Sequence, residues 1–261
     1  MPKKLFLVDG MAIAYRAYFA FIRNPLINSK GENTSAIFGF ANTLIKLFRD
    51  PTPDYLAIVS DTSAPTFRHE MHAEYKATRE KMPDDMASQL PRIRELAAAM
   101  RIPILKLKGY EADDLIGTLA LKAVTQEIEV TILTGDKDFM QLIRPGIQLL
   151  NPRRSGDDYE PVGVDGVREK FGVTPDKVID VLGLMGDASD NVPGVPGVGA
   201  KTATKLILEH GSLEEVLASA PDFKQKKLRE NLIEFADQAR LSKELVTIDT
   251  DSPVELDLEA M

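Results

Sequence analysis

Short apolar runs alternate with longer amphipathic segments up to about residue 150 of the chain. The runs are rich in aliphatic and β-branched residues and predict strands, whereas the longer segments repeat their apolar positions every three or four residues and predict helices. The predicted strands cover residues 3–8, 55–60, 102–107, 129–134 and 147–150, and the predicted helices cover residues 11–21, 34–49, 83–100 and 111–126. Strands that alternate with helices indicate an α/β fold with a mostly parallel central sheet flanked by helices.

Beyond about residue 162 the strand pattern stops and only helical spacing continues. A chain of 261 residues is long enough for one large domain with a helical appendage. We therefore expect an α/β core over residues 1–165 and a helical region over residues 166–261.

Acidic residues stand directly after the predicted strands. They are Asp9, Asp61, the group Glu111, Asp113 and Asp114, and the pair Asp136 and Asp138. A single acid in the first turn of a helix ordinarily complements the helix dipole and has no further meaning. Its repetition at successive strands favours a ligand site, because the carboxyl ends of parallel strands meet at one edge of the sheet, where ligands bind.

The composition excludes several classes of protein. The chain contains no cysteine, which excludes disulfide frameworks, zinc fingers and iron–sulfur clusters and suits a reducing cytoplasm. No apolar stretch approaches membrane-spanning length, so we expect a soluble, unexported protein with no membrane partner. The net charge of -8 argues on its own against a nucleic-acid partner, since such domains are usually basic.

The acids require cations if they converge. Two carboxylates about 5 Å apart repel by roughly 3 kcal/mol at an effective dielectric constant of about 20. Oxygen ligands without cysteine select hard ions, Mg²⁺ or Mn²⁺, and the three histidines lie apart from the acids in the sequence. Two such ions roughly 4 Å apart would suit phosphodiester hydrolysis. Much of the negative charge would then serve to bind metal.

Two basic segments are separate from the acids. The polar segment after the second predicted strand contains Lys76 and Arg79, which are candidates to neutralise a scissile phosphate and which would share a face if the segment is helical. Further on, Gly197 and Gly199 precede a helix that we expect to begin near Ala200. This pattern is typical of a helix-hairpin-helix turn, which offers backbone N–H groups to one DNA phosphate.

Five motifs together resemble the 5′-nuclease (flap endonuclease) family, most of all the N-terminal 5′-to-3′ exonuclease domain of bacterial DNA polymerase I. The motifs lie at residues 7–10, 67–79, 109–114, 134–139 and 183–203, and the resemblance extends from about residue 4 to residue 248. It implies a PIN-like 5′-nuclease fold with a helical arch around residues 64–83 and a helix-hairpin-helix at residues 183–210.

The resemblance also implies roles for individual residues. The first metal site would consist of Asp9, Asp61, Glu111, Asp113 and Asp114. The second metal site would consist of Asp136, Asp138, Asp187 and Asp190. The cations that act on the phosphate would be Lys76 and Arg79 in the arch, with Arg16 nearby. Contacts to DNA would come from Arg68, Lys81, Gly197, Gly199, Lys201 and Lys205.

The function implied by the resemblance is a 5′-to-3′ exonuclease and flap endonuclease that removes RNA primers and displaced 5′ strands in replication and repair. It would use two or more Mg²⁺ ions, with Mn²⁺ able to substitute, and K⁺ at the helix-hairpin-helix. Its partner would be DNA with a 5′ flap or a 5′ end at a duplex junction, together with a covalently linked or separate polymerase. We expect a monomer in the bacterial cytoplasm, associated with the nucleoid.

Three other functions compete with this interpretation. A catalytically silent module that binds branched DNA would not need nine acids at turns, which weaken binding to phosphates. A PIN-like ribonuclease would share the sheet and the acids but would leave the hairpin and its lysines unexplained. A P-loop ATPase is excluded, because Ala200 separates Gly199 from Lys201 and the loop follows a helix instead of a strand.

Overall fold

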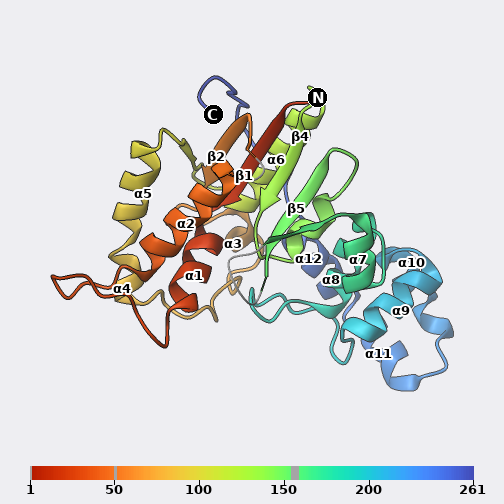
Figure 1. The fold of residues 1–261 in the computed structure, drawn as a ribbon. Helices are drawn as coiled ribbons and strands as arrows, with labels where there is room; N and C mark the ends of the chain where they lie inside the picture. The colour runs from red at the N-terminus through yellow and green to blue at the C-terminus, as the bar shows by residue number, and fades with distance from the viewer. Residues whose placement is uncertain (1, 50–51, 154–158) are drawn as a thin grey trace.

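A six-stranded sheet forms the centre of the computed structural model, which describes residues 2–49, 52–153 and 159–261 (Figure 1). The strands are β1 (Lys4–Asp9), β2 (Tyr55–Val59), β3 (Ile104–Leu105), β4 (Glu129–Leu133), β5 (Ile147–Pro152) and β6 (Tyr159–Val162). Their order is β3-β2-β1-β4-β5-β6, and every neighbouring pair is parallel except β5 and β6. Because the chain runs to β3 on one side of β1 and returns to β4 on the other, the carboxyl ends of β1 and β4 flank the crevice where open α/β sheets bind ligands.

Helices cover both faces of the sheet, as the alternation of side chains along β1 requires. Leu5 and Leu7 belong to the core that contains α6 (Ala112–Val124), whereas Phe6 and Val8 belong to the opposite core. The opposite core is covered by α1 (Gly10–Ala20), α2 (Ser35–Arg49) and α5 (Leu90–Ala99). The sheet is therefore buried on both sides, and its strand ends are left to carry function.

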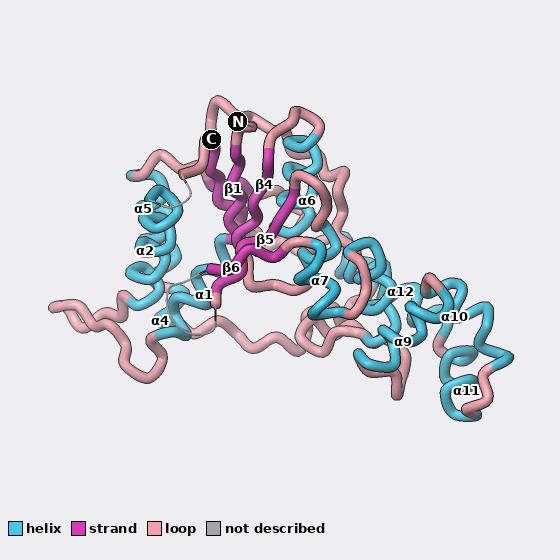
Figure 2. Tube along the Cα trace, turned by 45° about the vertical axis from the view of Figure 1, so that its right-hand side comes forward, coloured by secondary structure: helices cyan, strands magenta, loops and turns pink. Residues whose placement is uncertain are grey.

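The helical region lies beyond one side of the sheet (Figure 2). It contains α7 (Val164–Phe171), α8 (Val178–Met185), α9 (Ala200–His210), α10 (Leu213–Ser219), α11 (Lys226–Glu234) and α12 (Ala236–Val246), with short 3-10 turns at η2 (Pro175–Lys177) and η3 (Ala220–Asp222). The α8–α9 loop is closed at its neck by Gly186 and Gly194, both with positive φ. A Cβ on Gly194 would lie 2.4 Å from the backbone nitrogen of Gly186, so only glycine fits there.

The segment expected to form a helical arch is mostly irregular. Its only helix is the short α3 (Phe67–Met71), and residues 72–83 form turns and extended chain before α4 (Asp84–Ala87). Lys76 has a φ of 58°, which no α-helix accommodates, so Lys76 and Arg79 do not share a helical face, and no α-helix passes through them in the segment where the resemblance implied a helical arch.

Other predicted elements differ from the structure at their ends. The strand predicted at residues 102–107 is only two residues long, and the helix predicted at residues 83–100 is divided into α4 and α5, with a proline in the first turn of α5. Strand β6 was not predicted, because it lies at the sheet edge and has polar or exposed residues at most positions.

The last fifteen or so residues of the chain return along α6 to the amino-terminal end of the sheet. Ser252 shares a 2.8 Å hydroxyl contact with Thr118, and the Val254 carbonyl accepts a 2.6 Å hydrogen bond from Lys122. The Met261 carbonyl accepts a 3.2 Å hydrogen bond from the Leu56 amide at the start of β2. Both ends of the chain thus lie at the same end of the sheet (Figure 1).

None of the described helices is both long enough and apolar enough to cross a membrane.

Candidate active site

Acidic side chains from several strand ends and from the α8–α9 loop meet at the carboxyl edge of the sheet. One small cavity there is lined by four of the predicted acids: Glu111, Asp113, Asp138 and Asp190. Each of the remaining acids except Asp114 is linked to this group through its effect on a neighbouring carboxyl, as described below. The convergence predicted from the strand ends is therefore present.

Asp9 stands at the end of β1, where it also begins α1. Its Oδ1 accepts the Ala12 amide at 3.0 Å and its Oδ2 accepts the Thr134 hydroxyl at 2.9 Å. Burial, together with the charges of Asp61 and Asp136, raises the pKa of Asp9 to about 6, although these two hydrogen bonds lower it. Asp9, Asp61 and Asp136 therefore form one electrostatic group around the switch point of the sheet.

The first turn of α6 supplies the next acids. Glu111 begins the helix and is only 6% exposed, and Asp61 reaches the same turn by accepting the Ala112 amide at 2.8 Å. Burial raises the pKa of Asp113 well above its ordinary value, and the charges of Asp9, Asp136 and Glu111 add to this effect. Asp113, in the first turn of α6, thus lies close enough to the acids that follow β1 and β4 for their charges to act on it.

A second group of acids forms where the turn between β4 and the 3-10 helix η1 (Asp138–Leu142), the β4–η1 turn, meets the α8–α9 loop. Burial raises the pKa of Asp138 to about 7, and the charges of Asp136, Asp187 and Asp190 contribute in the same direction, opposed by Lys137. Asp187 is buried and is held by a short antiparallel bridge to Val192. Although burial opposes it, hydrogen bonds from Lys137 and Ser189 lower the pKa of Asp187.

Basic side chains partly neutralise both groups. Lys76 Nζ lies 2.7 Å from Glu111 Oε1 and 3.7 Å from Asp190 Oδ2, and Arg79 Nη2 lies 2.5 Å from Asp190 Oδ1. The segment is anchored by its backbone as well, since the Lys76 amide donates to the Asp190 carbonyl at 2.9 Å. Lys76 and Arg79 therefore face the acids without the helix that was expected to align them.

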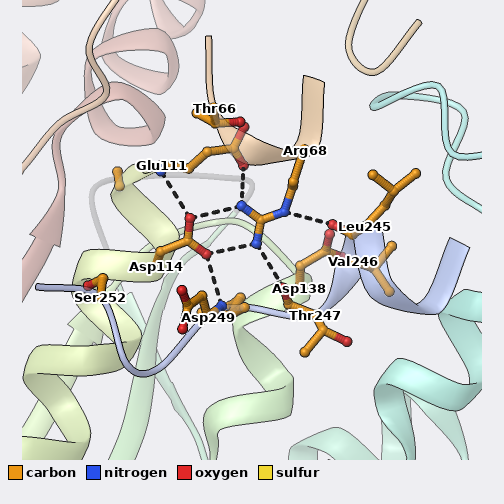
Figure 3. A network of polar contacts seen from close by, with 12 residues as sticks. Thr66, Arg68, Glu111, Asp114, Asp138, Leu245, Val246, Thr247, Asp249 and Ser252 are labelled. Carbon is orange, nitrogen blue, oxygen red and sulfur yellow. Dashed lines mark hydrogen bonds and ion pairs between the residues drawn. The ribbon is translucent and has the colours of Figure 1, made fainter. Parts of the chain in front are cut away.

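Asp114 does not face the other acids, contrary to its predicted place in the first metal site. Both of its oxygens are taken by the guanidinium of Arg68, at 2.8 and 2.7 Å, and by the amides of Glu111 and Asp249 (Figure 3). Asp114 is completely buried. Its two carboxylate oxygens thus accept four hydrogen bonds and are saturated.

Arg68 is likewise buried and is not placed to contact DNA as predicted. It is 2% exposed, and it donates to the carbonyls of Leu245 and Thr247 at 2.9 and 2.8 Å in addition to Asp114 (Figure 3). Its Nη1 also lies 3.6 Å from Glu111 Oε2. Arg68 therefore joins α3, the start of α6 and the end of α12, and it also lines the acidic cavity.

The other predicted basic residues lie on the surface at different places. Lys81 is 87% exposed and pairs with Asp84, and Arg16 donates to the Arg153 carbonyl near the end of β5 at 2.9 Å. The hairpin positions Gly197, Gly199, Lys201 and Lys205 are all exposed. They lie on the helical region, at the loop before α9 and on its first turns, where the helix begins at Ala200 as predicted.

Three residues of the site were missed by sequence reasoning. The Tyr75 hydroxyl lies 3.2 Å from Glu111 Oε2 and 3.4 Å from Asp190 Oδ2, and Thr134 orients Asp9. Lys137 pairs with Asp187. All three lie within motifs singled out from the sequence, Thr134 and Lys137 in residues 134–139 and Tyr75 in residues 67–79, but the contacts of Tyr75 also depend on the fold of an irregular segment.

Within the described ranges, no group of three or more histidine, cysteine, aspartate or glutamate side chains is already arranged to hold a metal ion. The carboxylates are instead paired with Lys76, Arg79 and Lys137. One buried acceptor among them is left over: Asp138 Oδ1 has no hydrogen-bond partner among the described residues.

The sequence matches two family models that together cover nearly the whole chain. Residues 4–172 match the 5′-3′ exonuclease, N-terminal resolvase-like domain, and residues 173–261 match the 5′-3′ exonuclease, C-terminal SAM fold. The chain is 45% identical over 260 residues to DNA polymerase I of Bacillus caldotenax and 46% identical over 260 residues to DNA polymerase I of Bacillus subtilis. Each match covers 99% of this chain and 29% of the relative, so the chain spans less than a third of these proteins.

Solved structures share the fold at lower identity. The T5 5′-exonuclease with bound zinc is 20% identical with a TM-score of 0.78, covering 95% of this chain and 90% of that one. The catalytic core of Rad2 in complex with DNA is 18% identical with a TM-score of 0.59, covering 98% of this chain and 82% of that one. The two family models match the α/β core and the helical region respectively, and the chain belongs to the 5′-3′ exonuclease family of nucleases.

Proposed function

We propose that this chain is a divalent-metal-dependent 5′-nuclease that hydrolyses DNA phosphodiesters as a 5′-to-3′ exonuclease and flap endonuclease. The observation that carries the proposal is the convergence of eight carboxylates, from separate parts of the chain, on the switch point of the sheet. These are Asp9, Asp61, Glu111, Asp113, Asp136, Asp138, Asp187 and Asp190. So many mutually repelling acids are stable together only when cations neutralise them.

The donor set fits hard divalent ions. All eight side chains offer carboxylate oxygen, and the buried Asp138 Oδ1 has no hydrogen-bond partner among the described residues. Mg²⁺ binds through a few carboxylates and retains waters, and Mn²⁺ accepts the same ligands. We assign one ion to Asp9, Asp61, Glu111 and Asp113, and a second to Asp136, Asp138, Asp187 and Asp190. Asp114 is left out because Arg68 and two backbone amides saturate it.

Bound divalent ions would supply an activated water and would stabilise the leaving oxygen of the phosphodiester. The chain's own residues bring the phosphate there. Lys76 and Arg79 stand at the acids and provide positive charge for the scissile phosphate. Burial of Asp9 and Glu111 limits access of bulk water to the reacting group.

A second DNA contact belongs to the helical region. The exposed turn at Gly197 and Gly199 opens onto the start of α9, where free backbone N–H groups attract a phosphate, and a K⁺ ion would support this contact. Lys201 and Lys205 add charge beside it. DNA with a duplex held at the hairpin and a 5′ flap or RNA-primed 5′ end at the acids fits both contacts.

The biological setting follows from the relatives and is part of the same proposal. DNA polymerase I from two bacilli contains a region like this chain, so we place the chain in replication and repair in a bacterial cytoplasm, near the nucleoid. A polymerase, linked or separate, would be its partner. We propose that the nuclease unit acts as a monomer, because one chain supplies every acid of the site.

The test is cleavage of 5′-end-labelled flap DNA with Mg²⁺ or with chelator. We expect a cut near the junction that needs Mg²⁺ and that Asp113→Asn reduces by about a thousandfold or more. Asp165→Asn, at a side chain that is 92% exposed on α7, is the matched control and should cut normally. Equal cutting with chelator, or by Asp113→Asn, would refute the proposal. Cleavage of single-stranded RNA with no cleavage of flap DNA would favour a PIN-like ribonuclease.

A further inference from the structure

Lys137 lies between Asp136 and Asp138 in the β4–η1 turn, and its side chain makes no capping hydrogen bond to the 3-10 helix that follows. Its ammonium forms an ion pair with Asp187 Oδ2 and lies 3.7 Å from Asp138 Oδ1. Lys137 thus bridges an acid from the α/β core and an acid from the α8–α9 loop. It touches the same carboxylates that are assigned above to the second ion.

The surroundings of Lys137 favour its charged form. The two acids are largely buried, with side-chain exposures of 15% for Asp138 and 7% for Asp187. A lysine side chain is ordinarily protonated at neutral pH, and both carboxylates lie within ion-pair distance of its ammonium. A permanent positive charge therefore occupies part of the space between these carboxylates.

The other cations of the site are engaged elsewhere. Lys76 pairs with Glu111, and Arg79 pairs with Asp190. Among the described residues, Lys137 is the cation that forms ion pairs with Asp138 and Asp187. Its side chain is 31% exposed and has a flexible four-carbon stem, so it can turn toward solvent without disturbing the core.

We propose that Lys137 is an internal counter-cation of the Asp138–Asp187 pair, which it neutralises when no divalent ion is bound and which it must leave when an ion binds. This inference rests on the proposed metal-binding function of these acids. An ammonium and a divalent ion on the same two carboxylates repel strongly in a partly buried site. Lys137 therefore stabilises the metal-free protein and lowers the affinity of the second site for metal.

Metal binding and the release of Lys137 are coupled in this proposal. Ion binding releases Lys137 from Asp187, so the lysine becomes free to face a phosphate on the same edge. A site that is neutralised by its own lysine also keeps the acids of the core and of the helical region together before metal arrives. Lys137 is accordingly a positioning residue, since it acts through Asp138 and Asp187.

The test measures Mn²⁺ binding without DNA, by electron paramagnetic resonance of free Mn²⁺ at low ionic strength. Lys137→Met removes the charge and retains most of the stem, and Lys137→Arg retains the charge. We expect Lys137→Met to bind the second Mn²⁺ about tenfold more tightly than the unmutated chain, and Lys137→Arg to stay within about threefold. With chelator, Lys137→Met should melt at a lower temperature than the unmutated chain, and saturating Mn²⁺ should remove or reverse this difference.

Unchanged Mn²⁺ affinity in Lys137→Met would overturn the competition. Weaker affinity would overturn it too, and would mean that the lysine organises the carboxylates for the ion. Failure of the unmutated chain to bind Mn²⁺ at all would overturn the metal site itself and the inference with it, so the two failures are distinguishable. Circular dichroism of each variant shows that a changed affinity does not come from an unfolded chain.

Discussion

At the scale of single residues, neighbours in the sequence have opposite roles. Asp113 and Asp114 are adjacent in the first turn of α6, but Asp113 faces other acids whereas Asp114 faces Arg68. The sequence could not separate them, because helical spacing alone puts Glu111 and Asp114 on one face. The distinction depends on Arg68, which is far away in sequence and is buried only when α3 and α12 are in place.

We predict that, when metal is chelated, Asp114→Asn destabilises the chain and Asp113→Asn does not. Asp114→Asn leaves a buried guanidinium without its carboxylate and should lower the free energy of unfolding by about 3–5 kcal/mol. Asp113→Asn removes a repelled, buried charge and should leave stability unchanged or slightly higher. Urea denaturation in chelator measures both. Equal losses in the two variants would contradict the assignment of Asp114 to Arg68.

The raised pKa values of Asp9 and Asp138 predict how stability without metal depends on pH. Both carboxyls have folded-state pKa values, about 6 and about 7, above their ordinary value of 3.8. The folded chain therefore binds protons more tightly than the unfolded chain, and this contribution to stability is lost as pH rises from about 4 to about 7.

In chelator, the chain should thus be less stable at pH 8 than at pH 5, because the stabilisation from protonated Asp9 and Asp138 is lost. The Asp138→Asn variant should show a smaller pH dependence of stability than the unmutated chain. Saturating Mg²⁺ should also reduce the dependence, because bound ions favour the ionised acids. Melting curves at the two pH values, with and without Mg²⁺, provide the measurement. A pH dependence that neither Asp138→Asn nor Mg²⁺ alters would count against the carboxylate group as its cause.

At the scale of elements, periodic segments were predictable and irregular ones were not. The strands β1, β2 and β4 and the helices α1, α2 and α6 lie where apolar periodicity predicted them, because burial on one or both faces fixes that pattern. The segment at residues 72–83 has no stripe of buried residues at helical spacing, so its sequence pattern did not decide whether it is helical, and the structure shows turns and extended chain there. Its position is set instead by bonds from Lys76 and Arg79 to the α8–α9 loop, which sequence alone does not reveal.

The α8–α9 loop is the element on which the site depends most. We predict that Gly194→Ala destabilises the chain by about 2 kcal/mol or more, since residue 194 has a φ of +60° and its new Cβ would meet the Gly186 backbone. Gly199→Ala is the matched control, because its Cβ would meet nothing within 4 Å, and it should change stability by less than about 0.5 kcal/mol.

Because the same loop carries Asp187 and Asp190, Gly194→Ala should also weaken Mn²⁺ binding, whereas Gly199→Ala should not. Urea denaturation and a Mn²⁺ titration test the two effects separately. Similar stabilities of the two variants would show that the neck of the loop tolerates a side chain.

At the scale of the whole molecule, the proposed DNA surface joins the edge of the sheet to the helical region. Catalysis is assigned to the edge of the sheet and duplex binding to the helical region, so mutations should be able to change catalysis and DNA binding separately. The general arrangement was predictable from the order of motifs, since a sheet with acids at its strand ends is followed by the hairpin. The neutralisation of the acids by Lys76, Arg79 and Lys137 was not, because it requires side chains from both parts of the chain to meet.

We predict that replacing Lys201 and Lys205 together by alanine lowers the salt dependence of binding to flap DNA. The slope of log K against log salt should fall by about two, because two phosphate contacts are lost. The cleavage rate at saturating enzyme should change little. Fluorescence anisotropy between about 50 and 200 mM salt measures the slope. Alanine at the exposed Arg92 and Arg94 of α5 is the matched control and should leave the slope unchanged, and a slope unaffected by the lysine changes would argue against the hairpin contact.

The last residues of the chain lie beside the start of β2, far from the acids, so labels can be attached there without obstructing the site. The Met261 carbonyl meets Leu56 where β2 starts, and β1 starts beside it at Lys4, whereas the acids stand where these parallel strands finish. A fluorophore or surface linker on either terminus is therefore held a strand's length from the acids. Immobilised single molecules, attached by either end, would present the catalytic edge to DNA in free solution.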